Sequence, residues 1–187
     1  MHYTDGLETE RLITRFVTPD DAAAWVEYCS DPVATKFSAI AGKTPGEMAE
    51  FVIDVTIKRY ADQKGGLQAL ISKETGELVG QCGLMIQEVD HKMEVEIGYH
   101  LLRKHWGKGY ATEAAAKFRD YGFENNLADS LVSIIDPKNV ASKNVATRNG
   151  MQLVATGVQF KGNEYELFRI TRREWEALLS ERAKVKS

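Results

Sequence analysis

The stretch that decides the fold is EVEIGYHLLRKHWGKGYATE, residues 94–113. It opens with the alternation of a half-buried strand, passes through a turn that contains Gly107 and Gly109, and continues as a helix from about Tyr110. A strand that meets a helix through a Gly-rich turn leaves several backbone N–H groups unpaired at the positive end of the helix dipole. The turn is therefore a candidate anion site, and the first question is whether it holds a phosphate.

The composition predicts a single globular domain spanning residues 1–187, with 43% hydrophobic and 27% charged residues. The net charge of -3 gives no electrostatic reason to expect nucleic acid or an anionic membrane as a partner. Cys29 and Cys82 form no disulfide framework and lack the spacing of metal ligands. Neither a signal peptide nor a membrane helix is indicated, so we expect a reduced, soluble, cytoplasmic protein.

Helix and strand signals alternate along the rest of the chain. We expect strands at 10–17, 67–72, 78–89, 93–103, 130–135, 152–160 and 164–170, and helical segments at 18–29, 31–37, 44–62, 110–125, 139–149 and 171–179. Capping boxes begin at Thr44 and Thr171. The order predicts an α/β sandwich with a mixed sheet.

The Gly turn departs from two familiar phosphate-binding loops. It is not a Walker loop, because Leu102 stands where the first glycine is needed and Tyr110 where Ser or Thr is needed. As a dinucleotide fingerprint it lacks the third glycine, although Ala111 is small. A plain strand-to-helix turn is the alternative. Lys104 and Lys108 flank the turn and no acidic residue interrupts it, which favours a phosphate.

The pattern Lys104-x-x-Gly107-x-Gly109-x-Ala111 resembles the acyl-CoA pyrophosphate loop of GCN5-related N-acetyltransferases, the GNAT superfamily. The fuller run is similar to one branch, the Rim-type ribosomal-protein N-terminal acetyltransferases and their relatives. That run consists of Glu96-Ile97-Gly98-Tyr99 and Trp106-Gly107-Lys108-Gly109-Tyr110-Ala111-Thr112-Glu113-Ala114.

The resemblance extends over nearly the whole chain. Its other segments are Glu8-Thr9-Glu10-Arg11-Leu12, Asn139-x-x-Ser142, Asn149-Gly150-Met151 and Arg173-Glu174-Trp175. Two positions depart from the branch. Lys104 stands where Arg or Gln is usual, and residues 147–151 read TRNGM where Glu-Lys-x-Gly-Phe is usual.

The resemblance implies a GNAT-like α/β fold, with a mixed, mostly antiparallel central sheet that splays at the cofactor site and helices on both faces. It implies acetyl-CoA as co-substrate, no metal, and direct attack of a primary amine on the thioester. Backbone amides of the loop would hold the pyrophosphate, and the preceding strand would guide the pantetheine arm. The expected cofactor-binding residues are Ile97, Tyr99, Leu101, Leu102, Lys104, Gly107, Lys108, Gly109, Tyr110, Ala111, Thr112, Asn139 and Ser142.

Two residues are the predicted catalytic groups, Glu96 and Ser142. Period two places Glu94, Glu96, Gly98 and His100 on one face of the strand. Glu96 matches the branch's glutamate and is the candidate base, acting directly or through water, with a structural carboxylate as the alternative. Glu94 and His100 are weaker candidates for that role.

Ser142 matches a serine placed near the thiol in that branch, which implies a general acid, and Asn139 matches a pantetheine ligand. Helix capping explains both residues equally well. Tyr99 is expected in the core or the cleft wall. Cys82 is not expected to form an acetyl-enzyme, because no activating base is indicated.

For the acceptor-binding side of the cleft, the sequence predicts fewer details than for the cofactor-binding side. Trp25, Tyr28, Phe37 and Tyr60 are candidates to line the acceptor cleft, with residues 38–43 as a mobile rim. The expected partner is an amine, either a protein or peptide N-terminus or a small molecule, with no nucleic acid or membrane and with a homodimer left open. A non-catalytic acyl-CoA-binding module is the main rival, and an NAD-type binder is a distant third.

Overall fold

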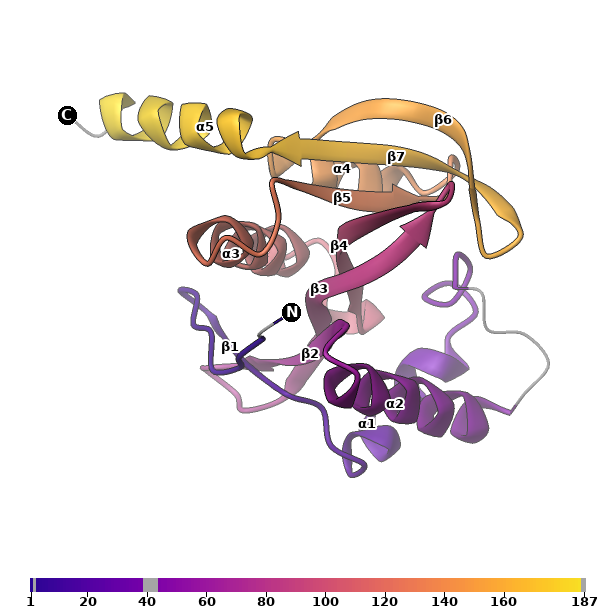
Figure 1. The fold of residues 1–187 in the computed structure, drawn as a ribbon. Helices are drawn as coiled ribbons and strands as arrows, with labels where there is room; N and C mark the ends of the chain where they lie inside the picture. Colours follow the sequence, from indigo (N-terminus) through magenta and orange to yellow (C-terminus); the bar gives the residue numbers. More distant parts are fainter. Residues whose placement is uncertain (2, 39–43, 186–187) are drawn as a thin grey trace.

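The computed structural model describes residues 1, 3–38 and 44–185. Within them, seven strands form one sheet with helices packed against it (Figure 1). The strands are β1 (Leu12–Arg15), β2 (Gly65–Ser72), β3 (Leu78–Val89), β4 (Lys92–Leu101), β5 (Ser130–Ile135), β6 (Gln152–Phe160) and β7 (Asn163–Thr171). The helices are α1 (Asp21–Ser30), α2 (Pro45–Ala61), α3 (Tyr110–Glu124), α4 (Val140–Arg148) and α5 (Arg172–Val185), with a short 3₁₀ helix η1 (Arg103–His105).

The sheet has the order β1-β2-β3-β4-β5-β7-β6. All neighbours are antiparallel except β4 and β5, which are parallel and meet at one register pair, Glu96 with Val132. By contrast, β3 and β4 pair along nearly their whole length. The predicted mixed, mostly antiparallel sheet that splays in the middle is therefore confirmed.

The two faces of the sheet carry different helices. Ala69 of β2 packs with Ile53 of α2, whereas the opposite face of β2 and β3 packs on α3 through Phe118 and Leu84. Side chains alternate between the faces along each strand, so α2 and α3 sandwich the sheet as predicted. All of these side chains are almost fully buried.

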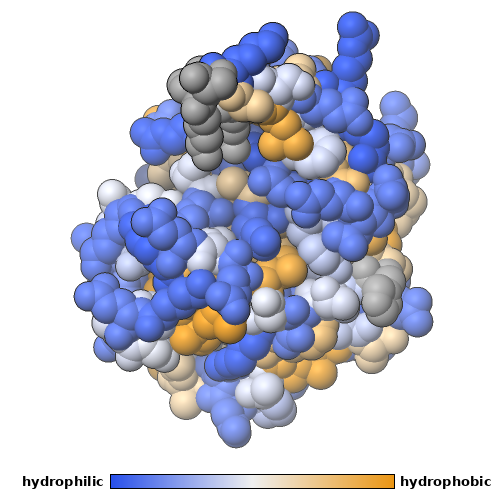
Figure 2. All heavy atoms as spheres, turned by 90° about the vertical axis from the view of Figure 1, so that its left-hand side faces the viewer, coloured by the Kyte–Doolittle hydropathy of each residue, from blue (hydrophilic) through white to orange (hydrophobic). Residues whose placement is uncertain are grey.

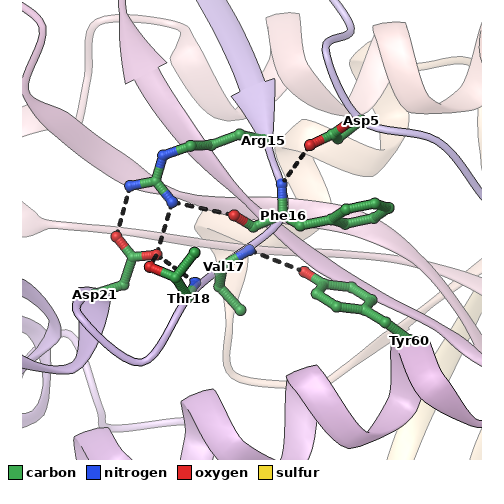
Figure 3. Close-up of polar contacts among 7 residues, drawn as sticks. All are labelled: Asp5, Arg15, Phe16, Val17, Thr18, Asp21 and Tyr60. Carbon is green, nitrogen blue, oxygen red and sulfur yellow. Dashed lines mark hydrogen bonds and ion pairs between the residues drawn. The ribbon is translucent and has the colours of Figure 1, made fainter.

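The connection between β1 and α1 is fixed by polar contacts (Figure 3). The Arg15 guanidinium donates to both carboxylate oxygens of Asp21, at 2.7 and 2.6 Å, and the Thr18 N–H donates to the same carboxylate at 2.8 Å. The Val17 N–H donates to the Tyr60 hydroxyl at 3.4 Å. Burial opposes ionisation of Asp21, but these hydrogen bonds prevail and lower its pKa. These contacts tie the start of α1 to β1. The Val17–Tyr60 contact ties the β1–α1 connection to α2.

Element boundaries differ from expectation in several places, beginning with β1, which spans Leu12–Arg15 instead of residues 10–17, and α1, which begins at Asp21 instead of residue 18. Residues 31–37 form turns instead of a helical segment. The Asp31 carboxylate accepts the N–H groups of Val33 and Ala34, at 2.8 and 3.3 Å, and the Thr35 N–H donates to the Asp31 carbonyl at 3.0 Å, but the turn that these bonds begin does not continue as a helix. The strand expected to reach residue 103 ends at Leu101, where η1 follows. The last helix continues past residue 179 to Val185.

The surface is mainly polar. Figure 2 shows a mostly hydrophilic face on which hydrophobic atoms gather in separate small patches. Among the described residues, no helix combines the length and the apolar character needed to cross a membrane.

Candidate functional site

The Gly turn has a backbone that favours glycine. Gly107 and Gly109 adopt φ values of +74° and +82°, in the left-handed region that L side chains rarely enter. A Cβ added to Gly107 would meet no atom within 4 Å, and one added to Gly109 would meet only the Arg11 guanidinium at 3.5 Å. Space alone does not require glycine here, so the requirement is conformational.

The first turn of α3 presents free N–H groups to this loop. Its first internal bond runs from the Glu113 N–H to the Gly109 carbonyl, at 3.0 Å, and Gly109 supplies no side-chain cap. By helix geometry the N–H groups of Gly109 through Thr112 have no partner within the helix. They lie at the positive end of the helix dipole, which gives the predicted anion site its physical basis.

The N-terminal segment braces this loop, a contact that the sequence did not predict. Arg11 donates to the Glu113 carboxylate at 2.7 Å and to the Lys108 carbonyl at 2.9 Å, and its guanidinium lies 4.4 Å from the centre of the Tyr110 ring. The Thr9 hydroxyl donates to Glu113 at 2.5 Å. Burial opposes ionisation of Glu113, but these bonds lower its pKa. The N-terminal segment therefore holds both the loop and the first turn of α3.

The two flanking lysines have different environments. Lys104 donates to the Glu27 carboxylate of α1 at 2.9 Å. Lys108 is exposed and makes no ion pair within the described part of the chain. A role for Lys104 at a pyrophosphate stays a prediction, and its structural role is to join η1 to α1.

The predicted arm-binding residues of β4 lie against the core. Ile97 and Leu101 are 1% and 8% exposed and pack on the α3 side of the sheet. The Ser133 hydroxyl of β5 donates to the Ile97 carbonyl at 2.9 Å, which bridges the two strands just beyond their register pair. Leu102 is buried instead with Trp25 of α1, and its N–H and carbonyl both take part in backbone hydrogen bonds.

Glu96 lies at the point where β4 and β5 separate. It is 9% exposed and accepts a hydrogen bond from the Gln87 side chain at 2.8 Å. Burial raises its pKa, against the lowering effects of Gln87, Lys161, Arg59 and a backbone N–H. A carboxylate that is held in place with a raised pKa has the properties of a general base.

Ser142 and Asn139 lie together at the start of α4. The Asn139 side chain accepts the Ser142 N–H at 3.1 Å, so Asn139 caps the helix. The Tyr99 hydroxyl donates to the Ser142 carbonyl at 2.9 Å. The Ser142 side chain is half-buried and also hydrogen-bonds Tyr99, which opposes the rise in the Tyr99 pKa caused by burial. The capping interpretation therefore holds for Asn139, and the side chain of Ser142 lies against Tyr99.

His100 lies on the opposite face of β4 from Tyr99, toward α1. Its Nδ1 lies 3.0 Å from the Tyr28 hydroxyl, which also contacts the Ala34 carbonyl and the Ser38 hydroxyl. Burial, assisted by Lys161, lowers the pKa of His100 to about 4, so the imidazole is neutral near pH 7. The pair joins α1 to β4, the strand that carries Glu96.

The aromatic residues expected to line the acceptor cleft lie in different parts of the structure. Tyr28 reaches β4, whereas Trp25, stacked on it at 4.6 Å, is 1% exposed and belongs to the core. Tyr60, which belongs to the cluster of Figure 3, also donates to the Leu67 carbonyl. Phe37 is half-buried in the turns after α1. Of the expected rim at 38–43, Ser38 contacts the Tyr28 hydroxyl, and residues 39–43 lie outside the described part of the chain.

Neither cysteine is placed for covalent chemistry. Cys29 and Cys82 are buried and unpaired, and burial raises the pKa of both thiols. Within the described residues, no cluster of His, Cys, Asp and Glu has the arrangement of a metal site.

The chain is similar in sequence and in fold to known proteins. Residues 11–152 match the acetyltransferase (GNAT) domain family. The uncharacterized N-acetyltransferase p20 of Bacillus licheniformis is 36% identical over 139 residues, which cover 74% of this chain and 77% of that protein.

Two solved structures illustrate the fold. The acetyltransferase from Agrobacterium tumefaciens str. C58 has a TM-score of 0.75 at 28% identity, over 91% of this chain and 96% of that one. Mycobacterium smegmatis RimJ, solved in complex with CoA-disulfide, has a TM-score of 0.67 at 22% identity, over 87% of this chain and 83% of that one. The RimJ similarity concerns the fold alone.

Proposed function

This chain belongs to the acetyltransferase (GNAT) family, and we propose that it transfers the acetyl group of acetyl-CoA to the nitrogen of a primary amine. One observation carries the proposal. The parallel strands β4 and β5 separate beyond Glu96, next to a helix whose first N–H groups are unpaired. A split sheet beside an anion site suits a cofactor with a pyrophosphate and a long neutral arm.

The residues of the loop fit the charged part of this co-substrate. The N–H groups of Gly109 through Thr112 would hold the pyrophosphate, with Lys108 as the adjacent cation. Ile97, Tyr99 and Leu101 would lie along the pantetheine arm, and the Asn139 amide would bind it. Backbone N–H groups of β4 would polarise the thioester carbonyl.

The two candidate catalytic groups come from different elements. Glu96 would take a proton from the attacking amine, directly or through water, because its carboxylate is fixed by Gln87 at the split. Ser142 would donate a proton to the leaving thiolate, since it matches the serine of the Rim-type branch and its side chain lies beside Tyr99 at the start of α4. The buried, unpaired cysteines support direct transfer without an acetyl-enzyme.

The acceptor is either a protein or peptide N-terminus or a small amine. The similarity of the Glu96–Ala114 run to Rim-type enzymes favours an N-terminus. A non-catalytic acyl-CoA-binding module would need the same loop and is the rival function.

A screen of amines and peptides for acceptor-dependent CoA release tests the proposal. We expect release with at least one amine and a product acetylated on nitrogen, with strongly reduced release by the Glu96→Gln variant. Acetyl-CoA binding without release for any acceptor would instead establish the rival. Absence of acetyl-CoA binding would refute both functions.

A further inference from the structure

Two cationic side chains lie beside Glu96 without an ion pair to any described carboxylate. Arg59 belongs to the last turn of α2, and Lys161 belongs to the turn between β6 and β7. Both act electrostatically on the Glu96 carboxylate. Neither has a carboxylate oxygen of the described chain within 4 Å. Their charges are therefore available to a ligand.

Arg59 is held in place by neutral groups. Its guanidinium donates to the carbonyls of Ile86, at 2.7 Å, and Lys64, at 3.1 Å. Ile86 directly precedes Gln87, whose side chain donates to Glu96. The buried Nε–H of Arg59 has no acceptor in the described protein. A buried donor without an acceptor on a half-buried cation is costly, which favours an anionic ligand nearby.

Lys161 reaches the same region from the other end of the sheet. Its ammonium lies 5.0 Å from the centre of the Phe160 ring, which packs in a cluster with Val132, the register partner of Glu96. Lys161 also acts electrostatically on His100, which lies four residues after Glu96 on the same face of β4. The β6–β7 turn therefore brings a positive charge toward the face of β4 that carries Glu96 and His100.

The two charged side chains that act on Glu96, Lys161 and Arg59, are both positive. Glu94, the next acidic residue on this face of β4, is already paired with Arg169 at 2.6 Å. His100 is neutral, and Glu96 is the carboxylate that acts on Arg59. A polyamine would bring a second positive charge against these cations, and a peptide would offer them a neutral amide.

We propose that the acceptor is a small amine that also carries a carboxylate, as free α-amino acids do, with Lys161 and Arg59 binding the carboxylate while the amine faces Glu96. This inference rests on the proposed acetyl transfer and specifies its substrate class. It also assigns Lys161 and Arg59 to acceptor binding instead of cofactor binding.

The test compares L-amino acids with their carboxamides, which keep the amine and remove the negative charge. We expect kcat/KM to be about tenfold higher for the acids, the effect of about 1.4 kcal/mol. Lys161→Gln should raise KM for the acids about fivefold, on the order of one exposed ion pair. It should leave KM for the carboxamides and for acetyl-CoA unchanged. Lys92→Gln, in the turn region of the β3–β4 hairpin, is the matched control and should change none of these constants.

The possible outcomes distinguish failure of the carboxylate site from failure of the acetyltransferase function. Equal use of acids and carboxamides, or better use of peptides or polyamines, overturns the carboxylate site and leaves acetyl transfer standing. A rise in KM for acetyl-CoA in Lys161→Gln also overturns it, because it assigns the lysine to the cofactor. Failure of every amine to release CoA refutes the acetyltransferase function itself.

Discussion

Glu96 shows how position and chemistry combine in one residue. The sequence predicted its face of β4 from period two, and the structure places it at the single register pair between β4 and β5. Its carboxylate is 9% exposed, and burial raises its pKa. A raised pKa makes the carboxylate a stronger base, which is present only above that pKa.

Replacing Glu96 with Gln should reduce kcat about 100-fold, the lower range for loss of a general base. The loss should be largest between the pKa of Glu96 and that of the amine, because wild type holds its base there while the amine is still protonated. It should shrink at higher pH, where solvent deprotonates the amine. Glu94→Gln, on the same face of β4, is the control in pH–rate profiles. A wild-type profile for Glu96→Gln would exclude it as the base.

Contacts between distant residues could not be predicted from the sequence. Arg11 and Thr9 bind Glu113 across about a hundred positions, and Ser133 bridges to Ile97 across the split. Each residue alone looks like an ordinary surface or strand residue, because only the tertiary fold brings the partners together. For Lys104 the sequence suggested a contact with phosphate, whereas in the structure its ammonium is paired with the Glu27 carboxylate.

The Gly turn and the helix α3 that follows it form one structural element. Two glycines in the left-handed region turn the chain so that the first N–H groups of α3 face outward together. The sequence predicted this from the Gly spacing and the helix start, because both signals are local. It misjudged residues 31–37, where the Asp31 side chain caps a turn that does not continue as a helix.

Gly109→Val should abolish measurable acetyl-CoA binding, because the side chain would crowd the N–H groups and strain the loop. Gly76→Val is a matched control, since Gly76 has a similar φ of +71° in the β2–β3 turn. Both variants should lose about 1–2 kcal/mol in free energy of unfolding from the left-handed conformation. Calorimetry should then show normal binding by Gly76→Val. Unchanged affinity in Gly109→Val would remove the loop from the cofactor site.

The whole molecule divides the proposed reaction between the two faces of its sheet. The α3 side carries the anion site, Tyr99 and Ser142, while the α1 and α2 side carries His100, Tyr28 and Arg59. The split between β4 and β5 lies between them. The net charge of -3 gave no indication of the cations beside Glu96, because a total charge says nothing of its distribution.

The most direct test of the central claim, direct acetyl transfer at the split in the sheet, is an initial-rate study in which acetyl-CoA and an accepted amine are both varied. Direct attack requires both substrates bound together, so we expect double-reciprocal lines that intersect and no CoA release before the amine is added. Parallel lines with a burst of CoA in the absence of the amine would reveal an acetyl-enzyme and contradict the account.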